Sequence, residues 1–173
     1  MIARLHQTLS LLLSYLLFYY IFSFDKISSI IIAIFVGIIS TIPDFDYKIF
    51  KWSNKQYLFL NKTKLKYPLF PYYLFILFLI KIFKHRGITH SIFPIILFFL
   101  LGFFTIRLFY LFSLAFLLHI IEDSLTVSGI QPFYPLLNFK FVIPILNNKK
   151  HRKLQIFLSY LTIFIFLYFI IFL

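Results

Sequence analysis

Histidine and acidic residues gather in four short clusters of an otherwise apolar sequence. Four of the 5 histidines and four of the 5 acidic residues belong to them. Imidazole and carboxylate are common ligands of Zn²⁺ and Mn²⁺, and the chain has no cysteine to supply a thiolate. The clusters therefore predict a divalent metal centre. They are His6; Asp44 with Asp46; His85 with His90; and His119 with Glu122 and Asp123.

The last cluster has the spacing of a helical ligand pair. His119 and Asp123 are four residues apart and so lie on one face of a helix, where both can reach one ion. The alternative is a hydrogen-bonded histidine beside a helix-end charge. Glu122 points about 100° away from Asp123. A salt bridge with a lysine is the preferred interpretation for Glu122, and a role as general base stays open.

Two aspartates follow an apolar run that ends at Pro43. Asp44 and Asp46 straddle one residue, so both can face one cavity. Asp44 is nearer the hydrocarbon and is the predicted ligand, whereas Asp46 is a candidate proton acceptor. The alternative is an Asx turn that closes the helix.

The stretch from His85 to Ser91 reads His-Arg-Gly-Ile-Thr-His-Ser. Thr89 or Ser91 is a suitable N-cap for the apolar run that follows. The helix N-terminus and Arg86 together make a natural seat for a phosphate group. One of His85 and His90 is expected to bind metal and the other to have a structural role, and the sequence does not choose between them.

The elements that position these clusters are predicted to be membrane helices. The chain is 62% hydrophobic and only 13% charged, which is typical of an integral membrane protein. We expect a single all-α, polytopic domain with about five transmembrane helices and one interfacial or re-entrant helix. The five predicted spans are 9–24, 27–42, 91–106, 108–121 and 154–173.

The region between the second and third spans decides whether the clusters meet. Residues 47–67 are polar and lysine-rich, and they indicate an interfacial loop or a short amphipathic helix. Residues 68–83 are apolar but short. If they crossed the bilayer, the histidines after them would lie about 30 Å from His6 and Asp44. We therefore expect residues 68–83 to be re-entrant or interfacial, which brings all four clusters, His6 included, to one side.

The basic residues support the same topology. If residues 68–83 do not cross the membrane, only Lys26 and Arg107 of the 17 lysines and arginines are expected on the side opposite the clusters. Such asymmetry predicts a multi-pass protein of the cell (inner or plasma) membrane whose site faces the cytoplasm. The net charge of +12 then favours contact with anionic membrane lipids over nucleic acid. His151, in a basic segment, is expected to be a solvated or lipid-facing charge.

In the order of its motifs, the chain resembles the YdjM-type family of membrane-bound metal-dependent hydrolases. The match covers most of the chain. It consists of His6, Pro43 to Asp46, His85 to Ser91, His119 to Asp123, and Thr126 to Ile130 with Pro135. A looser similarity to helical zinc phospholipase C and nuclease sites implies that Asp44, His90 or His85, His119 and Asp123 hold one ion. It also implies that His6 and Asp123 help to hold a second.

Together these features predict one membrane-embedded, hydrolase-like domain over residues 1–173. The expected activity is metal-dependent hydrolysis of a phosphoester in a lipid or lipid-linked substrate, with Zn²⁺ as the first expectation and Mn²⁺ as the second. Asp46 or Glu122 would accept a proton, and Arg86 would stabilise negative charge. The alternatives are a non-catalytic, metal-stabilised module and a metal-ion or proton transporter. Transport is disfavoured because the polar residues lie at helix ends rather than at mid-bilayer.

Overall fold

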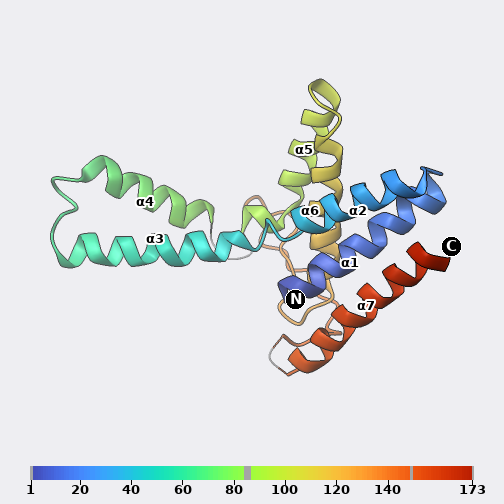
Figure 1. Cartoon of the computed structure of the whole chain (residues 1–173). Helices are drawn as coiled ribbons and strands as arrows, with labels where there is room; N and C mark the ends of the chain where they lie inside the picture. Colours follow the sequence, from blue (N-terminus) through green and yellow to red (C-terminus); the bar gives the residue numbers. More distant parts are fainter. Residues whose placement is uncertain (1, 84–86, 149, 173) are drawn as a thin grey trace.

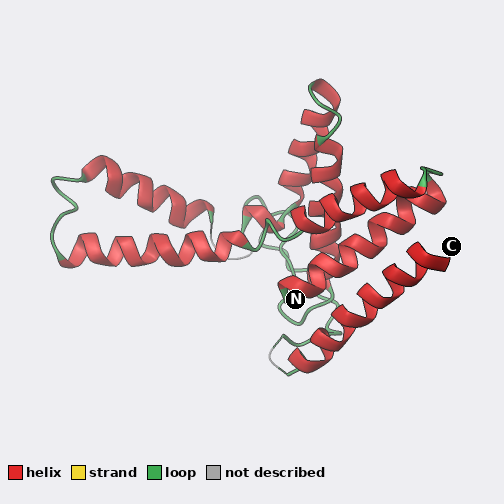
Figure 2. Ribbon diagram, viewed as in Figure 1, coloured by secondary structure: helices red, strands yellow, loops and turns green. Residues whose placement is uncertain are grey.

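The computed structural model describes residues 2–83, 87–148 and 150–172, which form seven α-helices (Figures 1 and 2). The all-α expectation is confirmed. Two isolated bridges, Thr126 with Leu146 and Ile130 with Phe141, are the only β pairings among the described residues. The helices are α1 Ala3–Leu16, α2 Lys26–Ile39, α3 Phe45–Lys62, α4 Phe70–Ile82, α5 Ile92–Phe104, α6 Phe109–Ser124 and α7 Arg152–Phe172.

Helices α1 and α2 form an antiparallel hairpin. Helix α1 continues through a π-helical segment, Leu17–Ile21, and the Asp25 carboxylate then caps α2 by accepting a hydrogen bond from the Ser28 amide at 2.9 Å. Gly37 permits the close approach of the two helices, since an added Cβ would lie 3.0 Å from the Gln7 carbonyl oxygen. His6, near the start of α1, and Asp44, just after α2, therefore lie at the same end of the hairpin.

Helices α3 and α4 form a second hairpin that projects away from the other helices (Figure 1). The rings of Tyr57 and Tyr73 stack between them, with centroids 5.8 Å apart. The chain leaves the first hairpin through α3 and returns through α4 to the short 3₁₀ helix η2, Ile88–His90. The sequence predicted one interfacial or re-entrant helix here, and the structure has two. The chain does return to Asp44, since His90 Nε2 lies 3.7 Å from Asp44 Oδ1. The membrane side on which they lie stays a prediction.

Helices α5 and α6 form the third hairpin, which carries the last cluster. Ser91 is the N-cap of α5 and accepts a hydrogen bond from the Phe93 amide at 3.4 Å. It is one of the two N-cap candidates, Thr89 and Ser91, that the sequence offered. Helix α6 packs on α2 through a buried apolar cluster, which consists of Val36, Ile39, Ala115 and Phe116. This packing holds the C-terminal end of α6, with His119 and Asp123, against the end of α2.

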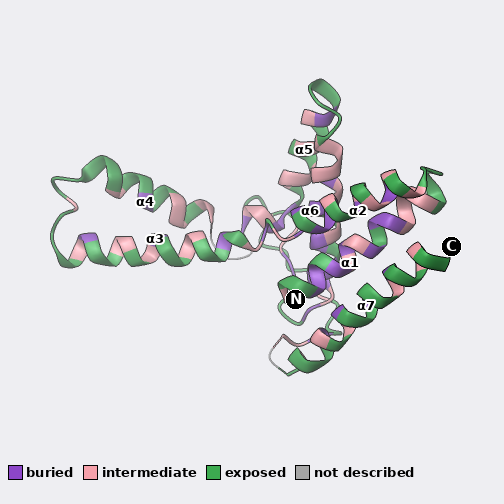
Figure 3. Ribbon diagram, viewed as in Figure 1, coloured by how far each residue is buried: buried purple, intermediate pink, exposed green. Residues whose placement is uncertain are grey.

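Helix α7 packs against α1. Phe166 contacts Leu12 and Tyr15, and Thr162 donates a hydrogen bond to Thr8 at 2.8 Å. Within the described ranges, α7 alone is long and apolar enough to cross a membrane by itself, while α2, α4 and α5 are shorter apolar helices. Much of the surface of each helix is exposed (Figure 3). Large apolar side chains such as those of Phe103 and Phe164 are among the exposed residues.

Candidate metal centre

Three histidines from three separate elements meet where the hairpins converge. His6 comes from α1, His90 from η2 and His119 from α6, and all three side chains are fully buried. The Nε2 atoms of His90 and His119 are 3.2 Å apart. The ring of His6 stacks on that of His119, with centroids 4.2 Å apart. The three imidazoles thus form one compact cluster.

Two aspartates complete the cluster. Asp44 Oδ1 lies 3.7 Å from His90 Nε2 and 3.8 Å from His119 Nε2. Asp123 Oδ1 lies 3.2 Å from His6 Nε2, and its Oδ2 lies 3.7 Å from His90 Nε2. The Asp44 side chain is 30% exposed, whereas that of Asp123 is 1% exposed. Asp44 is therefore the member of the cluster through which solvent or a ligand reaches it.

The other ring nitrogen of each histidine is held by an oxygen atom. His6 Nδ1 lies 2.7 Å from Glu122 Oε2, His119 Nδ1 lies 2.7 Å from the Ser40 carbonyl oxygen, and His90 Nδ1 lies 3.1 Å from Asp46 Oδ2. Because a carbonyl or carboxylate oxygen only accepts, we assign the proton to Nδ1 in each ring. A neutral imidazole so protonated presents the lone pair of Nε2 to the cluster, as a metal ligand must.

The two outer carboxylates are themselves fixed by hydroxyl groups. Glu122 Oε1 accepts a hydrogen bond from Ser10 at 2.9 Å, and Asp46 Oδ2 accepts one from Thr89 at 2.9 Å. Both carboxylates are buried. The salt bridge predicted for Glu122 therefore forms with His6 and not with a lysine. The proton-acceptor roles proposed for Asp46 and Glu122 stay predictions.

The spacing of the inward-facing atoms fits a bound metal ion. Two imidazole nitrogens on one tetrahedral Zn²⁺, each about 2.0–2.1 Å from it, are separated by about 3.3 Å. The corresponding distance between His90 and His119 is 3.2 Å. The potential ligands form two groups, and within each group the ligand atoms lie within 4.8 Å of one another. His119 belongs to both groups, which are His6, Asp44 and His119, and His90, His119 and Asp123.

One buried nitrogen also fits a bound cation. His6 Nε2 is enclosed and has no hydrogen-bond partner, and the nearest charged atom is a carboxylate oxygen of Asp123. An unpaired polar atom in a buried site is unfavourable. A cation between this lone pair and the carboxylate would satisfy both groups. The residues present therefore fit one or two divalent ions.

The carboxylates of the cluster favour a protonated His90 when no metal is bound. Burial acts to lower the pKa of His90, but the carboxylates of Asp44 and Asp46 outweigh it and raise this pKa to about 9. Burial acts to raise the pKa of Asp44, and its interactions with His90 and His119 outweigh it and hold this pKa below its usual value. A metal ion bound at Nε2 of His90 would have to displace a proton.

The structure brings five of the six predicted ligands together and leaves one untested. His85 lies outside the described residues, as does Arg86. His151 is in the turn before α7, where its Nδ1 accepts a hydrogen bond from the Asn147 amide at 3.3 Å. The sequence missed two contributors, Ser10 and the Ser40 carbonyl, because a backbone carbonyl has no side-chain signal and serines are frequent in this chain.

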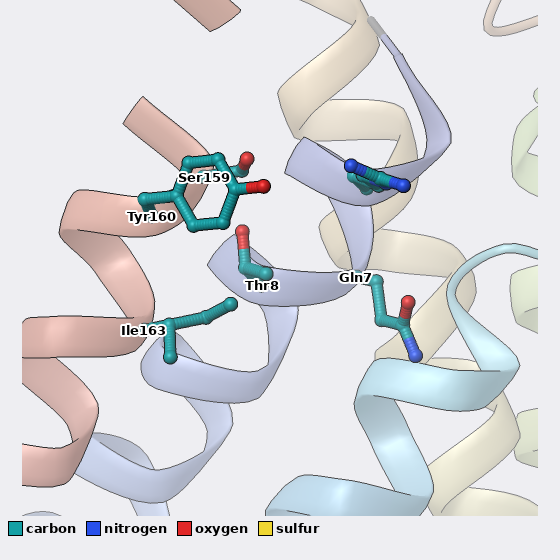
Figure 4. A pocket seen from close by; sticks show the side chains of 6 residues that line it. Gln7, Thr8, Ser159, Tyr160 and Ile163 are labelled. Atoms are coloured by element: carbon teal, nitrogen blue, oxygen red, sulfur yellow. The ribbon is translucent and has the colours of Figure 1, made fainter. Parts of the chain in front are cut away.

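A separate cavity of about 370 Å³ lies between α1 and α7. Figure 4 shows the side chains of α7 facing Thr8 of α1 there. None of the clustered histidines or aspartates is part of its lining, so this cavity is distinct from the candidate metal centre. Its lining residues are Arg4, Gln7, Thr8, Ser159, Tyr160 and Ile163.

Comparison with known proteins places the chain in a family. No curated protein and no solved structure matches it. One family model, described as YdjM inner membrane protein, matches residues 1–173, which is the whole chain. A match over the full length includes every residue of the histidine and aspartate cluster. The chain therefore belongs to the YdjM inner membrane protein family.

Proposed function

We propose that this inner membrane protein is a metal-dependent hydrolase that acts on a phosphoester of a lipid or lipid-linked substrate. One observation carries the proposal. Three buried histidines present Nε2 to a common centre with Asp44 and Asp123, and each Nδ1 is held by an oxygen atom. Outer partners of this kind orient imidazoles for metal binding.

His6, His90, His119, Asp44 and Asp123 would hold the metal. Nitrogen and carboxylate ligands suit Zn²⁺ first and Mn²⁺ second. A bound ion would supply a water of lowered pKa and would polarise a phosphoryl oxygen. The partial exposure of Asp44 supports an open position beside it, because a catalytic ion needs a ligand site that a substrate can reach.

The remaining polar residues would position the ligands and bind the substrate. Glu122 fixes His6, and Asp46 fixes His90, through the contacts of their buried carboxylates. A second role for either carboxylate, accepting a proton from water, would require the water to reach it past the histidine that it contacts. Arg86, three residues before Thr89, would bind the phosphate group.

The proposed placement in the membrane has α1, α2, α5, α6 and α7 as spanning helices. Their apolar outer faces support it, as do the small hydroxyl residues buried between them, which include Ser14, Ser29 and Thr162. The metal centre then lies at the ends of α2 and α6. With this topology, Lys26 and Arg107 would be the lysine and arginine on the side opposite the centre, and this asymmetry supports a centre that faces the cytoplasm.

A non-catalytic, metal-stabilised module is the second candidate. The specific observation in its favour is burial, since His6, His90, His119 and Asp123 are at most 1% exposed. A closed structural ion needs four ligands and no open position. The two candidates therefore differ in whether Asp44 leaves a site for a substrate.

Activity and metal content measured on the same detergent-purified protein separate them. We expect wild-type protein to hold about one or two equivalents of Zn or Mn and to release phosphate from phosphatidic acid or a related lipid phosphate. His151→Ala is the matched control, because His151 lies outside the cluster. Metal without hydrolysis on a broad panel of lipid phosphates would favour the structural module. Protein that holds no metal and binds none would refute both.

A further inference from the structure

The α3–α4 hairpin carries a basic face that the proposed hydrolase does not use. Lysines in α3 recur at positions 48, 51, 55 and 62, and all four are exposed. At 100° per residue, they fall within an arc of about 60°. That arc lies opposite Ser53, which is buried. The α3 helix therefore presents a row of positive charge, defined by Lys48, Lys51, Lys55 and Lys62, with the exposed apolar Leu58 and Phe59 between the last two lysines.

Among the described residues, none of these four lysines forms an ion pair, and Asp44, the N-cap of α3, lies in the candidate metal centre. The only acidic residue between 45 and 83 is Asp46, which is buried and binds His90 and Thr89. Lys48 instead lies over the ring of Phe45, with its Nζ 4.4 Å from the ring centroid. Trp52, the single tryptophan of the chain, is 45% exposed beside the row. Lysine beside exposed aromatic side chains is typical of a helix at a lipid headgroup layer.

Helix α4 supplies an apolar face on the other side of the hairpin. Ile76 is fully buried, whereas Leu74, Phe75 and Phe78 are 48%, 51% and 57% exposed. At 100° per residue, these three side chains lie about 100–160° around α4 from the buried Ile76. An apolar helix beneath a basic one has the charge and polarity gradient of a membrane surface, from acyl chains to anionic headgroups.

We infer that the α3–α4 hairpin docks on the anionic cytoplasmic leaflet, with the outer face of α4 in the acyl-chain boundary and the lysine row of α3 at the headgroup level. Each lysine near an anionic surface contributes about 1 kcal/mol of attraction. The occupant is an anionic phospholipid such as phosphatidylglycerol, because the row complements negative charge and α4 needs an apolar phase. This inference does not depend on the metal centre or on hydrolysis.

Trp52 allows a direct test in full-length protein. Its fluorescence is measured in nanodiscs of phosphatidylcholine alone and in nanodiscs of equal parts phosphatidylcholine and phosphatidylglycerol, with acrylamide as the water-borne quencher. We expect the quenching constant to be lower by about two-fold or more with phosphatidylglycerol, and the difference to shrink at high salt.

Two charge-matched variants make the test specific. Lys48, Lys51 and Lys55→Gln together should remove the protection by phosphatidylglycerol. Lys140, Lys150 and Lys153→Gln together, which remove the same charge outside the hairpin, should keep it. Each variant is first measured in detergent, so that local effects on Trp52 emission are subtracted and a misfolded variant is recognised by its helix content.

Three results would overturn the inference. Equal quenching in both lipid compositions would show that the row does not recognise anionic lipid. Equal loss of protection in both triple variants would assign the effect to net charge. If Trp52 were already protected from acrylamide in detergent, and the protein there had the mass of a dimer, the hairpin would contact a second copy of the chain instead of lipid.

Discussion

His90 Nε2 lies 3.2 Å from His119 Nε2, although the two residues are 29 positions apart and belong to different elements. Each ring donates its Nδ1 proton outward, His90 to Asp46 and His119 to the Ser40 carbonyl. Once a metal ion displaces the proton on His90, the two Nε2 atoms are at a distance that suits a shared ion. This contact joins η2, where the chain returns after α3 and α4, to the C-terminal end of α6.

Removal of an inner ligand should abolish metal retention. In His119→Ala and Asp123→Ala proteins, elemental mass spectrometry should find the metal content reduced from about one or two equivalents to near zero, because His119 belongs to both ligand groups and Asp123 to one. His151→Ala should retain the wild-type content. If all three variants behaved alike, the proposed site would not exist.

Removal of an outer partner should weaken the metal site without destroying it. Glu122→Ala leaves His6 Nδ1 without its acceptor, so the metal affinity should fall by about 10–100-fold. Glu122→Gln keeps an oxygen that can accept from His6 and should lose less. Competition with a metallochromic chelator measures both affinities. Equal affinities in wild type and Glu122→Ala would contradict the positioning role.

Metal removal should lower thermal stability. An ion that binds only the folded protein stabilises it by about 2.7 kcal/mol when its concentration is 100 times its dissociation constant. Chelation should therefore lower the melting temperature in detergent, and Zn²⁺ or Mn²⁺ should restore it. Asp123→Ala protein is the control, since its melting temperature should not respond to either treatment.

The topology predicts which positions are accessible from the cytoplasm. Single cysteines at Lys55 and Lys150 should react with a membrane-impermeant thiol reagent only when the cytoplasmic face is open, and cysteines at Lys26 and Arg107 should react from outside. The chain has no native cysteine, so no background labelling is expected. Labelling of Lys55 and Lys150 from outside would invert or break the proposed arrangement.

Substitution of Gly129 should destabilise the loop that follows α6. Gly129 has φ of 61°, and an added Cβ would clash with Val142 and lie 2.5 Å from the Phe141 carbonyl oxygen. The left-handed backbone alone costs a non-glycine residue about 1–2 kcal/mol. Gly129→Ala should therefore unfold at a lower temperature, while Ser128→Ala, one residue earlier, should not. Equal melting temperatures would show that the loop adjusts freely.

Residue types and spacing were enough to predict five residues that the structure brings together, because a few polar residues stand out in an apolar chain. Their role as metal ligands stays a prediction. His119 and Asp123 share a face by helical periodicity alone. The all-α class follows from the apolar runs, and family membership is confirmed over the whole chain. The Ser91 cap was likewise one of two positions that local sequence allowed.

Only the tertiary structure decided the contacts that cross between hairpins. The partner of Glu122 is His6, 116 residues away, and no local pattern distinguishes that pairing from a salt bridge with a lysine. The role of the Ser40 carbonyl is invisible in sequence because every residue carries one. His90 reaches the cluster because α3 and α4 pack as a pair that leads away and back. Such packing depends on long-range side-chain contacts, which sequence periodicity does not specify.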